Sequence, residues 1–331
     1  EDIGTKISVE EYNEACKRTV MRYTDLWNDL TEKMGYWVDM NDPYITYKPK
    51  YMETVWWLLK QIYNKELLYK GYTIQPYSPK AGTGLSSHEV NQPGSYRDVT
   101  DTTIVAQFKT IENSLPDFLK GFGPIDIMAW TTTPWTLPSN TALTVGPKID
   151  YVLVKTFNQY TNQPINVILG KPLVAKQFAG KYIAVETEAE FTENANLYSA
   201  FHKRGKDLTD DEKASVHRQI DSGTDLTKEP KIPYFIVKEF KGIDLVGIRY
   251  EQLLPYTLPY QNPENAFRVI AGDFVTTEDG TGIVHTAPTF GADDAKVAKE
   301  ATPEVPPMLV LDENGNQIGR ASCRERVSSP V

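Results

Sequence analysis

The chain has 331 residues, of which 40% are hydrophobic and 11% aromatic, and its formal net charge is −9. This composition is typical of a globular protein with room for two domains, and it excludes intrinsic disorder. No apolar run approaches the roughly 20 residues that span a bilayer, so we predict no membrane contact. The acidic balance argues against broad nonspecific binding to nucleic acid, which depends on cationic contacts with phosphates, and leaves only local contact.

Cysteine and histidine usage narrows the class of protein further. The two cysteines, Cys16 and Cys323, exclude a disulfide framework and favour a reducing cytoplasm. The chain opens on two acidic residues with no apolar segment after them, so no signal peptide is predicted. The four histidines and two cysteines show no metal-ligand spacing. We therefore expect a cytoplasmic protein without a metal site.

The first third of the chain is predicted to be helical. A capping box at 8–11 opens one apolar stripe, spaced by threes and fours, that continues to Met34 and stops at Gly35. A second helix is expected to start near Pro49 and to end before Gly71. Such an aromatic stripe is more often part of a core than of a site.

A segment rich in glycine, proline and serine follows, from Gly71 to Gly94. This composition is typical of a linker or a structured loop, and it places a domain boundary near residue 95. The run Gly82-Thr83-Gly84 is too short, and lacks the lysine, to predict a phosphate-binding loop. Residues 1–95 are therefore interpreted as a helical flank and connector.

From Val99 onward, short β-type runs separated by glycine and proline turns predict a β-barrel-like domain with a few helices, an α+β fold. This domain is assigned to residues 96–318. A charged stretch at 187–230, with a second capping box at 209–212, is interpreted as an inserted helical excursion on the surface. Residues 319–331 have no periodicity and are expected to be disordered or added by cloning. The predicted strands are 103–109, 125–130, 141–145, 151–155, 165–169, 182–186, 234–238, 267–271, 274–277 and 282–285.

A polar corner, residues 131–140, lies between the predicted core strands 125–130 and 141–145, and we call it the threonine corner. Each buried hydroxyl in such a place needs a hydrogen-bond partner. By itself the run is more often a capped turn, whose hydroxyls satisfy the local backbone, than the wall of a substrate site. Its candidate side chains are Thr131, Thr132, Thr133, Trp135, Thr136 and Asn140.

A second cluster lies at residues 280–294, which we call the histidine–aspartate segment. A glycine-flanked strand is expected to place His285 at its end, and a loop then leads to a helix expected at Ala295, preceded by Asp293 and Asp294. The histidine is equally explained as a satisfied core residue, and a single aspartate is more often a helix cap. With two neighbouring carboxylates, Asp293 is free to cap while Asp294 faces a pocket.

Together, the run 131–138 and the segment 285–294 resemble the CP1 editing domain of isoleucyl-tRNA synthetases, in class I of the aminoacyl-tRNA synthetases. Both motifs match in order and spacing. Related valine and leucine enzymes usually carry a basic residue at the position of Thr133, so the threonine points to the isoleucine branch. Residues 35–46 and 77–89 resemble the segment that leads out of the catalytic Rossmann fold of the family.

This resemblance covers nearly everything up to about residue 318, with two departures. One is that the charged stretch at 187–230 is longer than in compact versions of the domain. The His-x-Gly-His and Lys-Met-Ser-Lys-Ser signatures, which bind ATP in class I synthetases, are absent. The chain therefore resembles a fragment of a larger ligase that retains an editing site. The resemblance implies ATP and Mg²⁺ for the parent ligase reaction and no cofactor for editing.

The resemblance also implies roles for single residues. Asp294 is expected to hold the α-ammonium of a misattached valine. Thr136 and His285 are expected to wall the side-chain pocket, and Thr131, Thr132 and Thr133 to hydrogen-bond the ester, the terminal adenosine or the attacking water. Asn140 and Trp135 are expected to support the corner.

The expected activity is hydrolysis of valyl-tRNA(Ile), by a monomer that meets the acceptor end of tRNA(Ile) carrying valine and has no stable protein partner. Two other classes stay open. The chain could be a non-catalytic module that binds the tRNA end, or, with less support, a β-barrel protein-interaction domain.

Overall fold

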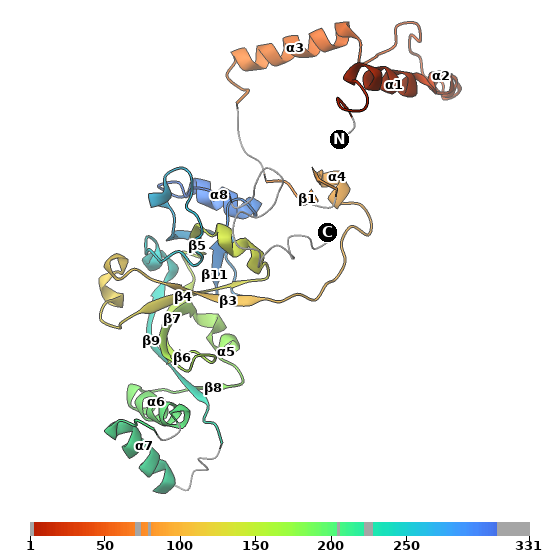
Figure 1. The fold of residues 1–331 in the computed structure, drawn as a ribbon. Helices are drawn as coiled ribbons and strands as arrows, with labels where there is room; N and C mark the ends of the chain where they lie inside the picture. Colours follow the sequence, from red (N-terminus) through yellow and green to blue (C-terminus); the bar gives the residue numbers. More distant parts are fainter. Residues whose placement is uncertain (1–2, 70–73, 79–80, 204–205, 222–227, 310–331) are drawn as a thin grey trace. The chain divides into compact units, whose positions relative to one another are not determined.

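A computed structural model describes residues 3–69, 74–78, 81–203, 206–221 and 228–309 (Figure 1). The chain divides into two compact units, residues 1–72 and 73–331. The division falls within the predicted glycine- and proline-rich connector, before the boundary expected near residue 95. The predicted tail at 319–331 lies outside the described residues.

The first unit contains α1 (Val9–Met21), α2 (Thr24–Lys33) and α3 (Pro49–Asn64). The capping box at 8–11 is present in both directions. The prediction of one uninterrupted helical stripe is wrong, because the helix breaks at 22–23, where the Thr24 hydroxyl donates to the Met21 carbonyl. None of the residues in these helices is buried, so the stripe forms no core within this unit.

The second unit begins with a two-stranded ribbon and a single helical turn, followed by a nine-stranded mixed sheet with helices. The ribbon and turn are β1 (Tyr77–Ser78), β2 (Thr83–Gly84) and α4 (Ser87–Val90). The sheet strands are β3 (Ile104–Lys109), β4 (Ile125–Thr131), β5 (Ala142–Val145), β6 (Asp150–Phe157), β7 (Pro164–Gly170), β8 (Tyr182–Ala184), β9 (Ile232–Lys241), β10 (Arg268–Ala271) and β11 (Ile283–Thr286). The helices are α5 (Val174–Gln177), α6 (Glu188–His202), α7 (Asp210–Asp221) and α8 (Ala292–Glu300).

The strands follow the order β10-β5-β11-β4-β7-β6-β9-β8, with β3 on the other edge of β4. Strand β4 therefore has β3 along one edge, while β7 and β11 share its opposite edge at its two ends. Nine of the ten predicted strands are present with small shifts at their ends. The strand predicted at 274–277 is wrong, because the chain turns directly after β10.

The predicted α+β class is confirmed, but the sheet is not a closed barrel. Its named strands leave β10 and β3 unpaired with each other. Residues 249 and 250 connect the two edges by isolated β-bridges. Arg249 pairs with Arg268 of β10, and Tyr250 pairs with Thr110, which follows β3. The main hydrophobic core lies inside this curved sheet and includes Phe108, Ile127, Leu143, Tyr250 and Val269.

A close approach of two glycines allows β7 and β11 to meet beside β4. The Gly170 amide donates to the Thr281 carbonyl at 2.7 Å. A Cβ at Gly282 would lie 3.3 Å from the Gly170 Cα, and φ at Gly282 is +73°, a conformation that favours glycine. This contact therefore holds the start of β11, the strand that contains His285.

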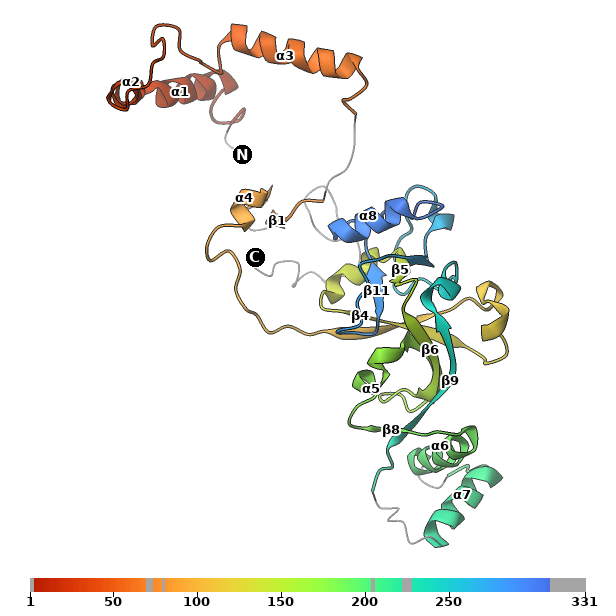
Figure 2. The same cartoon turned by 180° about the vertical axis from the view of Figure 1, so that it is seen from behind.

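Within the charged stretch at 187–230, helices α6 and α7 form a hairpin that lies at the β8 and β9 end of the sheet (Figures 1 and 2). Strands β8 and β9 are parallel, and parallel strands need a long crossover connection. The hairpin supplies that crossover, so it is more than a surface excursion.

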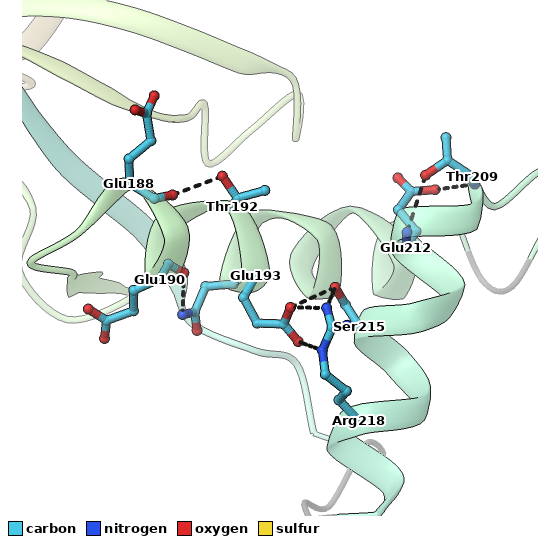
Figure 3. Close-up of polar contacts among 9 residues, drawn as sticks. Glu188, Glu190, Thr192, Glu193, Thr209, Glu212, Ser215 and Arg218 are labelled. Carbon is cyan, nitrogen blue, oxygen red and sulfur yellow. Dashed lines mark hydrogen bonds and ion pairs between the residues drawn. The ribbon is translucent and has the colours of Figure 1, made fainter.

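Polar contacts and a small apolar cluster hold the hairpin together. Glu193 on α6 accepts from Ser215 at 3.0 Å and forms an ion pair with Arg218 on α7 (Figure 3). Glu212 closes the predicted capping box by accepting from the Thr209 amide at 2.8 Å. On the other side of α6, a hydrophobic cluster of Phe157, Tyr198 and Ile232 attaches the helix to the sheet.

Candidate functional site

The sheet brings the threonine corner and the histidine–aspartate segment together. Strand β4 ends at Thr131, a 3₁₀ helix covers Pro134–Ser139, and β5 starts at Ala142. Strand β11 lies between β4 and β5, with His285 opposite Leu143 and Val284 opposite both Trp130 and Thr144. Two motifs that are about 150 residues apart in sequence therefore share one end of the sheet.

A direct hydrogen bond joins the two motifs. The Thr136 Oγ1 and His285 Nε2 atoms are 2.8 Å apart, and both side chains are buried. The Thr136 hydroxyl also donates to the Thr133 carbonyl at 2.8 Å. A hydroxyl has one hydrogen to donate. When that hydrogen lies on the carbonyl, Thr136 Oγ1 is an acceptor, which favours the tautomer in which His285 donates from Nε2.

His285 is held neutral by its surroundings. Burial lowers the pKa of His285 to about 4. Its Nδ1 atom lies 3.4 Å from the Asn140 Nδ2 group, which is a donor only, so Nδ1 is the unprotonated nitrogen. A neutral imidazole whose lone pair faces another side chain is not a general base for a substrate. His285 is instead suited to form a wall.

Asn140 is bonded on every side and is almost fully buried. Its Nδ2 group donates to the Ala142 carbonyl at 2.8 Å, and its Oδ1 accepts from the Tyr250 hydroxyl at 2.7 Å. The predicted supporting role of Asn140 thus has a clear geometry, directed at His285. Tyr250 was not predicted, since nothing in its local sequence distinguishes it from a core tyrosine.

The remaining threonines of the corner keep hydrogen-bonding capacity. Thr131 Oγ1 accepts from the Thr133 amide at 3.1 Å, and the two hydroxyls lie 3.3 Å apart. Thr132 is exposed. Trp135 is half-buried beside them, with no polar contact among those the structure describes. The corner is therefore both a capped turn and a polar surface, because only part of its hydroxyl capacity is used locally.

Asp294 anchors the histidine–aspartate segment. Its Oδ2 atom accepts from the Ala287 amide at 2.9 Å. Burial raises the pKa of Asp294, although that backbone hydrogen bond acts in the opposite direction. Across the described ranges, no cation forms an ion pair with this carboxylate. The interpretation of an aspartate as the helix cap is wrong, because α8 starts after Gly291 without a side-chain cap.

Hydrogen bonds connect most of the predicted site residues directly, but not Asp294. Thr131, Thr133, Thr136, Asn140 and His285 are linked by hydrogen bonds, whereas Asp294 is connected through Ala287, two residues after His285. Within the described part of the chain, no group of three or more His, Cys, Asp or Glu side chains is placed to hold a metal ion.

A cavity of about 520 Å³ lies elsewhere, between β10 and the face of α8. None of the threonine corner lines this cavity, and its only residue next to the predicted site is Asp293. Because it lacks the corner residues, this cavity is separate from the candidate site. Its walls include Arg268, Asp273, Phe274, Lys296 and Glu300.

Comparison with known proteins identifies the family. The model of class I tRNA synthetases (I, L, M and V) matches residues 1–280, and the chain belongs to this family. Within it, the chain is similar to isoleucine–tRNA ligases. It is 55% identical over 315 residues to the ligase of Bacteroides fragilis, covering 95% of this chain and 24% of the relative. It is 54% identical over 316 residues to that of Porphyromonas gingivalis, covering 96% and 24%.

The chain thus spans about a quarter of the curated relatives that it matches. Among solved structures, GlLeuRS-CP1 is similar at a TM-score of 0.32 and 15% identity, over 60% of this chain and 59% of that one. The editing domain of the Plasmodium knowlesi cytosolic leucyl-tRNA synthetase is similar at 0.36 and 11%, over 63% and 66%. No helix in the described ranges is long and apolar enough to cross a membrane.

Proposed function

We propose that the second unit hydrolyses the ester between valine and tRNA(Ile), as the editing site of an isoleucine–tRNA ligase. The observation that carries this proposal is the 2.8 Å contact between Thr136 and His285, which joins the two motifs into one site. The similarity to isoleucine–tRNA ligases supports the substrate class.

The need for a second site follows from the size of the substrate difference. One methylene is worth about 1–3 kcal/mol, a general range for which isoleucine against valine is itself the usual example. A synthetic pocket for isoleucine therefore also accepts valine. In the proposed editing site, Thr136 and His285 form the wall that admits the valine side chain and excludes the longer isoleucine side chain.

Asp294 is the proposed ligand of the α-ammonium group. It is a half-buried carboxylate that forms no ion pair with a cation among the described residues. A bound ammonium group would supply the missing positive charge through a charge-assisted hydrogen bond. Its second proposed role is structural, because its bond to the Ala287 amide holds the loop that follows His285.

The proposed chemical step is attack of water on the ester carbonyl carbon, which releases valine and leaves a free ribose hydroxyl on the tRNA. Thr131, Thr132 and Thr133 offer hydroxyls for the ester, the adenosine or the water. An aminoacyl ester is already activated, so positioning and electrostatic stabilisation suffice without a covalent nucleophile. His285 is not proposed as the base, because both of its ring nitrogens face protein groups, Nε2 at Thr136 and Nδ1 at Asn140.

We propose no cofactor for this step, and ATP and Mg²⁺ only for the ligase reaction of the parent protein. The proposed partner is the acceptor end of tRNA(Ile) carrying valine. We expect the protein to act in the cytoplasm, as a monomer without a stable protein partner.

The test compares deacylation of valyl-tRNA(Ile) and isoleucyl-tRNA(Ile) by the 331-residue chain. We expect release of valine and sparing of isoleucine. Asp294→Asn keeps an oxygen for the Ala287 amide but removes the charge, so it should lower valine release by about 100-fold with little change in stability. Asp293→Asn, the exposed neighbour, is the matched control and should retain activity.

Two outcomes would contradict this function. Equal hydrolysis of both esters would contradict the assignment of Thr136 and His285 as the wall that selects by size. Protection of valyl-tRNA at high protein concentration would instead favour a module that only binds the tRNA end.

A further inference from the structure

The hydrogen bonds behind the threonine corner all run in one direction. Tyr250 donates to Asn140 over 2.7 Å, and Asn140 faces the acceptor nitrogen of His285 over 3.4 Å. His285 then donates to Thr136 over 2.8 Å, and Thr136 donates to the Thr133 carbonyl over 2.8 Å. Each group uses its hydrogen on the next one, so the direction is determined at both ends of the series.

We propose that Asn140 and Tyr250 are positioning residues that hold His285 in its Nε2–H tautomer and thereby keep the polar atoms of the size-selecting wall away from the substrate. Neither residue needs to touch the substrate for this role. The effect on substrate selection rests on the proposed function. The tautomer of His285 does not depend on it.

The orientation of the Asn140 amide is determined by the backbone. Its Nδ2 group donates to the Ala142 carbonyl at 2.8 Å. If the amide were reversed, its oxygen would face that carbonyl, and two acceptors would be in contact. The correct orientation presents a donor to His285 Nδ1. The imidazole must therefore carry its hydrogen on Nε2.

Tyr250 completes the set by satisfying the Asn140 oxygen, which is buried and has no other described donor. Its own ring is nearly inaccessible and lies edge-on to Phe108, with centroids 5.2 Å apart. Desolvation raises the pKa of Tyr250 well above its usual value, so the hydroxyl stays a donor. A backbone hydrogen bond also holds Tyr250 in place, because its amide donates to the Phe267 carbonyl at 3.0 Å.

This arrangement has a consequence for the proposed pocket. Because Thr136 and His285 use their hydrogens on the Thr133 carbonyl and on Thr136, the wall offers no free donor to an incoming side chain. An aliphatic side chain such as that of valine loses nothing there, whereas the hydroxyl oxygen of threonine would find no donor. A pocket of this kind is expected to favour a valyl over a threonyl ester, by about 10- to 100-fold.

The test is NMR of the 331-residue chain labelled with ¹⁵N-histidine, which has four histidines to resolve. The His285 signals are identified by their loss in His285→Gln. In the unmodified protein at pH 7, we expect a neutral ring with the hydrogen on Nε2. Asn140→Asp replaces the donor with an acceptor of the same shape, so the hydrogen should move to Nδ1.

Tyr250→Phe should allow both tautomers to appear and should reduce the preference for valyl over isoleucyl ester by about 10-fold, the effect of one lost hydrogen bond. The matched control is Tyr198→Phe. Tyr198 is equally buried and also donates to an asparagine oxygen at 2.7 Å, but it lies on α6. Its removal should leave the His285 signals unchanged.

A hydrogen on Nδ1 in the unmodified protein would overturn the proposal, whether or not the Asn140 and Tyr250 variants fold. Unchanged Nε2–H signals in Asn140→Asp would do the same, as would identical His285 spectra for Tyr250→Phe and Tyr198→Phe. The predicted tautomer combined with no valine release would contradict the proposed function alone.

Discussion

Thr136 has one hydroxyl hydrogen, and it is donated to the Thr133 carbonyl over 2.8 Å. That bond agrees with the Nε2–H tautomer that the Asn140 amide favours at His285, and it separates the corner into two parts. Thr136 and His285 have hydrogen-bond partners in the protein, whereas Thr131, Thr132 and Thr133 retain unused hydrogen-bonding capacity, and of these three Thr132 is exposed. The proposed division into a size-selecting wall and a polar surface for the ester follows from this distribution of hydrogens.

Two neighbouring buried threonines should respond in opposite ways to removal of a hydroxyl. Among the described residues, Thr141 Oγ1 is the one buried side-chain oxygen or nitrogen without a partner. Thr141→Val should therefore leave the free energy of unfolding unchanged or raise it by up to about 1 kcal/mol. Thr144 is the matched control, because its hydroxyl lies 2.6 Å from that of Thr286.

Thr144→Val leaves the Thr286 hydroxyl buried without its partner, at a cost of about 1–3 kcal/mol. Urea unfolding of both variants measures the difference. Equal destabilisation by the two substitutions would show that the Thr141 hydroxyl is satisfied in solution.

The pKa of His285 gives a pH dependence with a definite sign. Its value falls from 6.5 to about 4 on folding, so the unfolded chain binds a proton that the native protein does not. Stability should therefore decrease as the pH falls from about 6.5 to about 4, by roughly 3 kcal/mol in total, and His285 should add no further loss below that range.

The measurement is urea unfolding at several pH values for the unmodified chain and for His285→Gln, which cannot titrate. The difference between the two curves isolates His285 from the carboxylates. Parallel curves between pH 7 and pH 4 would mean that the imidazole is accessible to protons in the native state.

Local sequence predicted single residues better than their pairings. The threonines and His285 were identified from motifs, yet their contact depends on β11 entering between β4 and β5. No local pattern specifies that register. Tyr250 was missed for the same reason, since its hydroxyl meets Asn140 across 110 positions. The sequence separated Asp293 from Asp294 only in part, because Asp294 is the less exposed of the two, but neither aspartate caps α8.

At the scale of elements, periodicity and turn residues predicted the strands well. Strands β4, β6 and β7 lie within two residues of their predicted ends because alternating or continuous apolar runs are bounded by glycine and proline. The helix break at 22–23 was missed, since neither glycine nor proline marks it. The parallel pairing of β8 and β9 was also hidden, although it explains why a helical hairpin is inserted there.

The α6–α7 hairpin should depend on one buried carboxylate. Glu212 is almost inaccessible and is held by Lys203, with contacts of 2.8 and 2.9 Å. Lys203→Met leaves this charge without its cation, so we expect a loss of about 1–3 kcal/mol of local stability. Hydrogen exchange of the α6 and α7 amides measures this loss.

Lys213→Met is the matched control on the same hairpin. Lys213 pairs with Asp210, and both side chains are exposed, so its removal should change protection by less than about 0.5 kcal/mol. Adding Glu212→Gln to Lys203→Met should restore part of the protection. Equal effects of the two lysine substitutions would show that the burial of Glu212 has no energetic role.

At the scale of the whole molecule, charge limits how the proposed site meets its substrate. A net charge of −9 offers few cationic contacts to tRNA phosphates. We therefore expect weak binding of valyl-tRNA by this chain, with saturation only at high concentration. A small valyl ester of adenosine, which lacks most of the phosphates, should be hydrolysed with a similar rate constant at saturation.

Comparing the two substrates checks this expectation through KM and kcat separately. Tight, salt-sensitive binding of the tRNA would contradict it. Such a result would mean that the chain contains a cationic tRNA surface that its overall charge conceals.

The division into two units leads to a last prediction, for a chain reduced to residues 73–331. Every residue of the proposed site, from Thr131 to Asp294, belongs to the second unit, which also contains the hydrophobic core clusters. The first unit instead exposes large apolar side chains, including Trp27 and Trp56, each 67% accessible. Removing it should lower the binding of a hydrophobic dye and leave the ratio of valyl to isoleucyl ester hydrolysis unchanged.

This outcome is expected because the site residues make their hydrogen bonds to groups of the second unit, which the deletion leaves in place. The thermal unfolding midpoint of the shortened chain should match that of the sheet in the full chain. Loss of the tautomer signal of His285 on deletion would contradict the independence of the second unit. Loss of selectivity with that signal intact would instead place part of the selection for valine in the first unit.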